Sequence, residues 1–214
     1  MVKPVYCIVF LLLLLSCGNA SHASFPIVES KPQPKPVVDL AKTKQKAKQA
    51  LVYCIKHHYN TNFCLLLDMS LHSGVNRFFV WNFKTDTIQY SGLVSHGCGE
   101  NPWGRTNSSN SPLFSNIKDS HCSSLGRYKV SNRSNSEWGI HVMYYLYGKD
   151  TTNSNALARE IVFHSWNKVS DSEVYPAGTP EGWGCPAVSD NTMAYVDALL
   201  KVEPKPTLMW MYNQ

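Results

Sequence analysis

Charged residues are scarce in this sequence. Asp, Glu, Lys and Arg make up 16% of its 214 residues, against about 25% in an average soluble domain. The formal net charge is only +5, and most of the excess lies in one lysine-rich stretch, so nothing here supports a nucleic-acid partner. Hydrophobic residues at 43% and aromatic residues at 12% exclude a disordered chain. The length favours one domain of roughly 100–200 residues plus a leader.

Long hydrophobic runs are absent beyond the N-terminus. Residues 5–15 form an apolar run of eleven residues behind Lys3, which is too short for the roughly 20 residues that cross a bilayer. This pattern is typical of a signal peptide and predicts export. No later segment approaches that length, so we expect no transmembrane helix.

The end of the leader can be interpreted in two ways. Residues 14–17 read Leu-Leu-Ser-Cys, which resembles the lipobox of bacterial lipoproteins and predicts a signal peptide over residues 1–17 with lipidation of Cys17. The alternative is ordinary cleavage after Ala20 or Ala23. Either route predicts a location in the periplasm or cell envelope. A lipid anchor is the only membrane contact that we expect.

The remaining chain divides into a linker and a β-rich domain. Residues 18–46 are rich in Pro and Lys and predict an extended linker, followed by a folded domain over residues 47–214. Apolar residues at helical spacing from Ala47 to Ile55 predict a helix at the domain entry, around residues 38–59. Ser189 is expected to cap a second helix over residues 190–200. Short runs of β-forming residues predict strands over 63–69, 77–83, 87–94, 125–130, 139–146, 160–163 and 207–212.

Metal-ligand spacings are also missing. The sequence contains no C-x-x-C or H-E-x-x-H pattern, so we expect no metal site. An exported chain lies in an oxidising compartment, where disulfides persist. With Cys7 and Cys17 assigned to the leader, five cysteines remain. Two disulfides among them would leave one free thiol.

Cys185 is the strongest candidate for that free thiol. It follows Gly184, whose backbone freedom allows successive N–H groups to converge on an oxyanion, and a predicted helix begins shortly after it. A nucleophilic cysteine needs a base, and His164 ends an apolar predicted strand. These residues alone leave open the ordinary alternative, a buried cysteine and a core histidine.

Two motifs carry a family resemblance. Residues 161–165 (IVFHS) and 182–187 (GWGCPA) resemble the motif pair of the YkuD-like L,D-transpeptidase catalytic domain, and more closely its murein L,D-transpeptidase branch. That branch also shows, in the same order, the segments 94–97 (VSHG), 114–116 (FSN) and 123–126 (SSLG). The resemblance extends from about residue 50 to residue 212.

The resemblance implies a mainly β fold, with a sandwich or barrel-like sheet, an N-terminal helix and a helix after the catalytic cysteine. It implies a cysteine acyltransferase that acts on peptidoglycan stem peptides without a cofactor. By position, Cys185 is the nucleophile, His164 is its base, and the Ser165 carbonyl orients the imidazole. The N–H groups of Gly184 and Cys185 form the oxyanion hole. Trp183 is expected to line the substrate groove, unless its role is structural.

The nucleophile motif departs from the wider family, which reads Ser/Thr-His-Gly-Cys. That tetrapeptide occurs instead at residues 95–98, ahead of the strand with His164 and without a helix after it, so Cys98 is not the expected nucleophile. His96 is expected to line the substrate site or to serve the structure. Pro186 and Ala187 replace the Arg or Asn that often follows the cysteine, which leaves substrate preference open.

The other cysteines and the exact reaction complete the predictions. Cys98 and Cys122 flank a polar loop and are expected to form one disulfide, and Cys54 and Cys64 a second. Two alternative functions remain. Water as the acceptor would make the same site an L,D-carboxypeptidase, and a domain that retains only the fold would be a catalytically idle wall-binding module.

Overall fold

The computed structural model describes residues 34–106 and 112–213. The predicted signal peptide, Cys17 and the first part of the predicted linker lie outside the described residues. In the described part of the chain, no helix combines the length and the apolar character needed to cross a membrane.

The first helix, α1 (Leu40–Lys56), lies within residues 38–59, where the sequence predicts a helix. The carboxylate of Asp39 caps it by accepting the backbone N–H of Lys42 at 3.1 Å, which satisfies a donor that the helix itself leaves unpaired. Residues 40–46, which the sequence analysis assigned to the linker, therefore belong to this helix. Lysine is a good helix former, and Lys46 is buried on this helix, so the lysine-rich stretch is helical from Leu40 onward.

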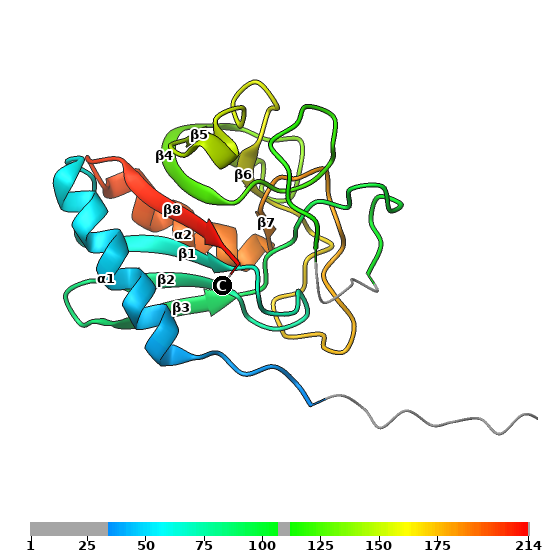
Figure 1. Cartoon of the computed structure of the whole chain (residues 1–214), viewed down its shortest axis with the longest axis horizontal. Helices are drawn as coiled ribbons and strands as arrows, with labels where there is room; N and C mark the ends of the chain where they lie inside the picture. The colour runs from blue at the N-terminus through cyan, green and yellow to red at the C-terminus, as the bar shows by residue number, and fades with distance from the viewer. Residues whose placement is uncertain (1–33, 107–111, 214) are drawn as a thin grey trace, which may run out of the picture. The chain divides into compact units, whose positions relative to one another are not determined.

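A single eight-stranded sheet carries the rest of the fold, which confirms the predicted mainly β class (Figure 1). Across the sheet, the strands are β3 (Thr87–Gly92), β2 (Phe78–Asn82), β1 (Phe63–Asp68), β8 (Thr207–Tyr212), β4 (Gly126–Asn135), β5 (Val142–Gly148), β6 (Val162–Ser165) and β7 (Ala187–Val188). Two neighbouring pairs, β1 with β8 and β6 with β7, are parallel, and the other pairs are antiparallel.

Two short elements and one extension escaped the sequence prediction. β7 has only two residues, and the 3-10 helix Thr151–Asn153 has three, so neither is long enough to show a periodic pattern. β4 continues to Asn135 through a polar segment that contains few strand-forming residues. The other strands lie within a few residues of their predicted positions.

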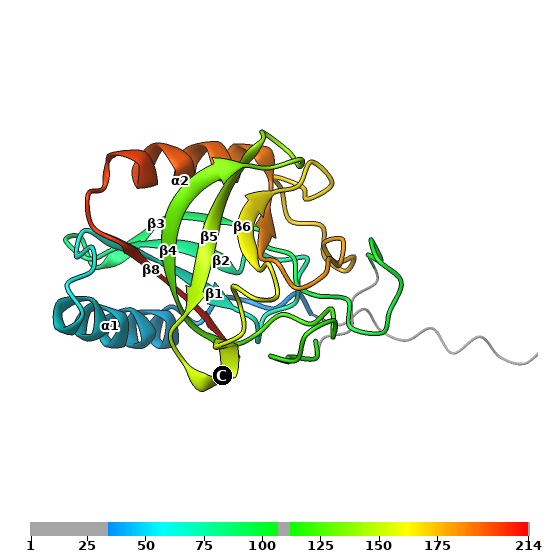
Figure 2. The same ribbon diagram turned by 90° about the horizontal axis from the view of Figure 1, so that it is seen from above.

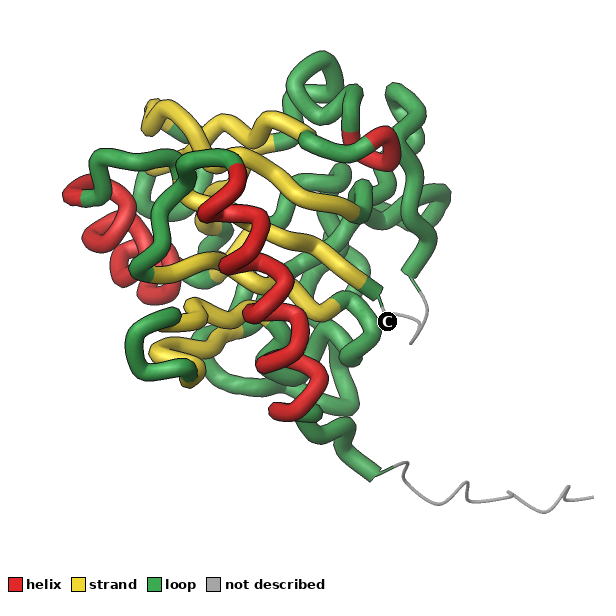
Figure 3. The backbone as a smooth tube through the Cα atoms, turned by 60° about the vertical axis from the view of Figure 1, so that its left-hand side comes forward, coloured by secondary structure: helices red, strands yellow, loops and turns green. Residues whose placement is uncertain are grey.

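β1 is buried on both faces, and each face belongs to a different core. α1 lies across one face (Figure 3), where Cys54, Cys64 and Leu66 pack together. Successive residues of a strand point to opposite sides, so Leu65 and Leu67 enter the other core. Burial raises the pKa of Cys54 to about 12 and that of Cys64 well above its usual value, so both thiols stay protonated.

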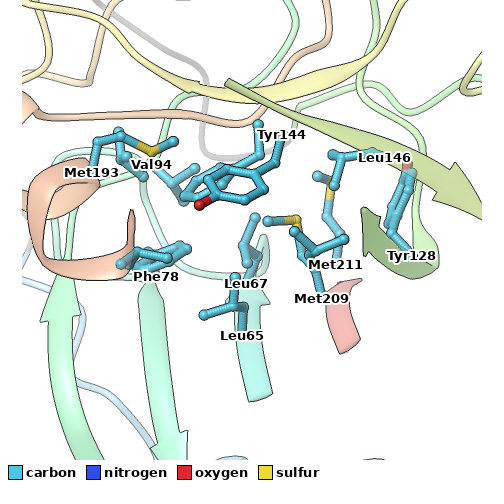
Figure 4. Close-up of a cluster of buried hydrophobic side chains, with 14 of the residues drawn as sticks. Leu65, Leu67, Phe78, Val94, Tyr128, Tyr144, Leu146, Met193, Met209 and Met211 are labelled. Atoms are coloured by element: carbon cyan, nitrogen blue, oxygen red, sulfur yellow. The ribbon is translucent and has the colours of Figure 1, made fainter. Parts of the chain in front are cut away.

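The second core fills the space between the strands and the helix α2 (Asp190–Val202) (Figure 4). Leu67, Phe78 and Tyr144 from three strands meet Met193 of α2 there. α1 and α2 lie on opposite sides of the strands (Figure 2). Ser189 caps α2 by accepting the backbone N–H of Thr192 at 3.2 Å, so the predicted cap is confirmed.

A buried carboxylate fastens α2 to the sheet. Asp197 accepts hydrogen bonds from the Tyr144 hydroxyl of β5 and from Arg133 Nε of β4, both at 2.7 Å. Burial opposes ionisation, but the hydrogen bonds from Arg133, Tyr144 and Lys201 outweigh it and lower the pKa of Asp197. Because α2 follows β7 directly, this contact also holds the end of the segment that carries Cys185.

We expect Asp197→Ala to lower the free energy of unfolding by about 1–3 kcal/mol, because it leaves the buried Tyr144 hydroxyl without its acceptor. Urea denaturation of the purified domain measures this loss. Asp171→Ala is the matched control, since its exposed carboxylate contacts only Asn191 in the same region, and it should cost about 0.5 kcal/mol or less. Equal losses in the two variants would contradict the role of Asp197.

Candidate active site

The parallel pairing of β6 with β7 brings the two predicted catalytic side chains to one place. His164 lies opposite Ala187 in this pairing, and Ser165 lies opposite Val188. Cys185 precedes Ala187 by two residues, so it reaches the start of β6 beside His164. Both side chains line a cavity of about 110 Å³.

The imidazole of His164 is held in a defined orientation. Its Nδ1 lies 2.8 Å from the carbonyl oxygen of Ser165, which can only accept, so Nδ1 carries the proton and Nε2 is left as the basic nitrogen. Burial lowers the pKa of His164, although the Ser165 carbonyl acts in the opposite direction. The imidazole is therefore neutral at pH 7 and able to accept a proton.

The thiol of Cys185 is half-buried and contacts the backbone at the start of β6. Its Sγ accepts the backbone N–H of Val162 at 3.4 Å and donates to the carbonyl of Glu160 at 3.7 Å. Burial raises the pKa of Cys185 above its usual 9.0, while the Val162 N–H and the Arg159 charge lower it. At rest the pair is thus a neutral thiol beside a neutral imidazole.

Gly184 has a backbone conformation that a side chain would strain. Its φ is +103°, and a Cβ built there would lie 2.6 Å from the carbonyl oxygen of Cys122. Only glycine permits this approach without displacing the neighbouring loop. No acceptor among the described residues takes the backbone N–H of Gly184 or of Cys185, so both donors are available to a ligand.

The segment that contains the wider family's tetrapeptide lies directly beside the nucleophile segment. The backbone N–H of Ser95 donates to the Ala187 carbonyl at 2.8 Å, and the Ala187 N–H donates to the Ser95 hydroxyl oxygen at 3.1 Å. The His96 carbonyl accepts the N–H of Gly182 at 2.8 Å. This motif therefore positions the chain on which Cys185 stands.

A third motif residue, Ser123, links both segments. Its hydroxyl oxygen accepts the N–H of Gly97 at 3.0 Å and donates to the carbonyl of Gly184 at 3.1 Å. Three of the five segments that carry the family resemblance (94–97, 123–126 and 182–187) are thus joined by hydrogen bonds around one turn. Their shared role here is to fix the backbone before the nucleophile.

His96 lies behind the cavity rather than within it. It is 2% exposed, and Arg77 Nη2 lies 2.9 Å from its Nδ1 while Glu181 Oε1 lies 3.6 Å from its Nε2. Burial lowers the pKa of His96. It lines a separate cavity together with Cys98. The structure therefore favours the structural interpretation of His96 and separates Cys98 from His164.

Arg159 is a site residue that the sequence did not reveal. Its guanidinium donates to the carbonyls of Ser115 at 2.8 Å and Cys122 at 2.6 Å, and to the Ser124 hydroxyl at 2.5 Å. It thereby holds the loop that packs against Gly184, and its positive charge lowers the pKa of the Cys185 thiol. A single arginine in a polar stretch carries no recognisable pattern, so no sequence signal was available.

The predicted cysteine pairs are neighbours, although the structure holds all five described cysteines as free thiols. Hydrogen bonds from Gly97 to Ser123 and from Gly99 to the His121 carbonyl, at 3.0 and 3.2 Å, flank Cys98 and Cys122. Cys54 and Cys64 share one core. Both disulfides stay predictions. Within the described ranges, no group of three His, Cys, Asp or Glu side chains could hold a metal ion.

Replacing Arg159 by Gln should raise the pKa of the Cys185 thiol, because it removes the positive charge that favours the thiolate. The measurement is the pH profile of iodoacetamide alkylation at Cys185, whose midpoint should lie above 9.0 in the parent chain and move further upward in the variant. Arg159→Lys should restore part of the shift. Lys84→Gln removes an exposed charge elsewhere and serves as the control; an unmoved midpoint in Arg159→Gln contradicts this assignment.

Protein recovered from an oxidising compartment should contain the Cys98–Cys122 disulfide and a free Cys185 thiol. Closing this loop stabilises the fold by roughly 3 kcal/mol in the chain-entropy model, so reduction should lower the unfolding free energy by a similar amount. Peptide mapping without reductant identifies the pairs. The prediction fails if Cys98 and Cys122 are both unpaired or if either is joined to Cys185.

Comparison with known proteins shows the family of this chain. A crystal structure of an L,D-transpeptidase from Xylanimonas cellulosilytica shares 13% sequence identity, covers 75% of this chain and 68% of that chain, and has a TM-score of 0.40. No curated protein sequence matches significantly. The family model described as L,D-transpeptidase catalytic domain matches residues 35–211. Since that match spans most of the sequence, the chain belongs to the L,D-transpeptidase catalytic domain family.

Proposed function

We propose that this chain is a peptidoglycan L,D-transpeptidase that forms a thioester on Cys185 and transfers the acyl group to an amine of a neighbouring stem peptide. One observation carries the proposal: Cys185 and a neutral, oriented His164 share one cavity. Family membership supports the substrate class. The retained nucleophile, base and orienting carbonyl argue against an idle wall-binding domain.

The acylation half-reaction begins with transfer of the thiol proton to Nε2 of His164. The Cys185 sulfur then attacks the carbonyl carbon at the L-centre of the diamino acid, and the carbonyl π electrons move to oxygen. The N–H groups of Gly184 and Cys185 stabilise this oxyanion. Collapse breaks the C–N bond, protonated His164 gives its proton to the leaving amine, and D-alanine departs from the thioester.

The second half-reaction returns the enzyme to its starting state. An amine of a neighbouring stem attacks the thioester carbon while Nε2 of His164 removes a proton from that amine. Collapse breaks the C–S bond, and the thiolate regains the proton from the imidazolium. Water in place of the amine would give an L,D-carboxypeptidase from the same steps, so the product distinguishes the two reactions.

Two resting features determine how this pair works. The thiol hydrogen bond to Glu160 must be exchanged for one to His164, and the raised pKa of Cys185 makes a standing thiolate a minor species. His164 therefore acts as a general base during attack. We place the reaction in the cell envelope after export, with a lipid on Cys17 as the proposed anchor.

Replacing either Cys185 or His164 by Ala should reduce cross-linking by roughly 10³-fold or more, and the double variant should be scarcely worse, because the two groups act as a unit. Mass analysis of muropeptides after incubation with purified domain measures both cross-linked and hydrolysed products. Cys98→Ala is the matched control and should retain activity. Activity in Cys185→Ala together with inactive Cys98→Ala would reverse the choice of nucleophile.

A further inference from the structure

The exposed tryptophans of the described residues gather at one place. Trp183, Trp138 and Trp103 are 62%, 44% and 41% exposed, and all three line the cavity that contains Cys185 and His164. An indole leaves a large apolar face in water when it is exposed, and such groups collect at binding sites. Their position at the catalytic cavity therefore indicates a ligand beyond the reacting bond.

Trp166 also lines this cavity. Together with two of the exposed rings, Trp103 and Trp138, it forms a connected surface that we call the tryptophan platform. Trp103 stacks on Trp166 with ring centroids 4.9 Å apart, and Trp138 lies 6.0 Å from each of the other two. Trp166 is 3% exposed and supports the two outer rings. The platform is thus an aromatic wall with a buried base.

The backbone holds each part of the platform in place. Gly104, next to Trp103, donates its N–H to the Glu181 carbonyl at 2.8 Å. The Ser165 hydroxyl oxygen accepts the N–H of Ile140 at 2.9 Å, which fixes the loop that carries Trp138. The backbone N–H of Trp166 donates to the Val188 carbonyl at 2.8 Å. A surface ordered before binding loses little entropy when a ligand arrives.

Charge narrows the kind of ligand that fits. Lys168 Nζ lies 5.1 Å from the ring centroid of Trp103 and 5.9 Å from that of Trp166, so a cation already occupies the edge of the platform. Among the described residues that line the cavity, none carries a carboxylate. An ammonium group on a diamino acid would be repelled by Lys168, which favours a neutral ligand.

A hydrogen-bond donor at the base of the platform adds a second requirement. Trp166 Nε1–H is buried and has no acceptor among the described residues. Buried donors are normally paired, so a ligand oxygen that reaches the base of the platform would satisfy this N–H. The site therefore fits a neutral molecule that combines flat C–H surface with acceptor oxygens.

We propose that the tryptophan platform binds an N-acetylated amino sugar of the glycan strand that bears the stem peptide, an inference that rests on the proposed function. The C–H face of such a sugar packs on the indole faces, and a hydroxyl or acetamido oxygen accepts from Trp166. Stem peptides offer mainly methyl groups and charged side chains, which cover far less of an aromatic wall. Trp103 and Trp138 are the exposed rings of the platform, so they are the surfaces that the sugar can cover.

The test compares glycan binding with peptide chemistry in the same proteins. Glycan strands freed of their stem peptides are titrated into the parent domain, Trp103→Ala and Trp138→Ala, with affinity read by isothermal calorimetry. Acylation of Cys185 by a free tetrapeptide stem is measured in parallel by intact mass. Each platform variant should weaken glycan binding by about tenfold or more, the scale of losing one stacking ring, and by more than it slows acylation.

Ile55→Ala, which alters an exposed side chain on α1, is the control and should change neither measurement. The inference is overturned if the parent domain does not bind bare glycan, or if the platform variants lose peptide acylation as much as glycan affinity. Glycan binding with no acylation of the parent domain would instead contradict the proposed function. Thermal unfolding of each variant confirms that it is folded.

Discussion

The parallel pairing of β6 with β7 is the constraint on which this active site depends. It sets His164 opposite Ala187 and so brings the chain just after Cys185 alongside the strand that carries the base. β6 is in turn held by β5, and β7 leads directly into α2, whose Asp197 is fastened to β4 and β5. The position of Cys185 relative to His164 therefore depends on the pairing of the strand that follows Cys185 with the strand that carries His164.

A ring of hydrogen bonds then shapes the turn before the nucleophile. Ser123 joins the Gly97 segment to the Gly184 carbonyl, and Arg159 holds the Cys122 carbonyl against Gly184. These contacts hold the Gly184 and Cys185 N–H groups in one arrangement before any substrate arrives. Donors that are ordered in advance stabilise a developing oxyanion without a reorganisation cost. The family's motif residues thus act mainly through backbone geometry.

Local sequence patterns predicted most of the elements and suggested the candidate catalytic pair, and tertiary packing decided the rest. β8 could be predicted from its run of strand-forming residues and the Ser189 cap from capping chemistry. The pairing of Cys185 with His164 was proposed from their motifs. Residues 40–46 were assigned to the linker because a lysine-rich stretch serves equally as a linker or as a helix surface. Arg159 and Trp138 were missed because their roles arise from contacts between segments distant in sequence, which no local pattern records.

The central claim is that Cys185 is the nucleophile of this cavity. A carbapenem offers the most direct measurement, because its strained lactam carbonyl accepts a thiolate and opens without losing atoms. After incubation with the folded domain, intact mass should rise by the full mass of the drug, and peptide mapping should place the adduct on Cys185. Folded protein that stays unmodified, or that carries the adduct on Cys98, would contradict the account.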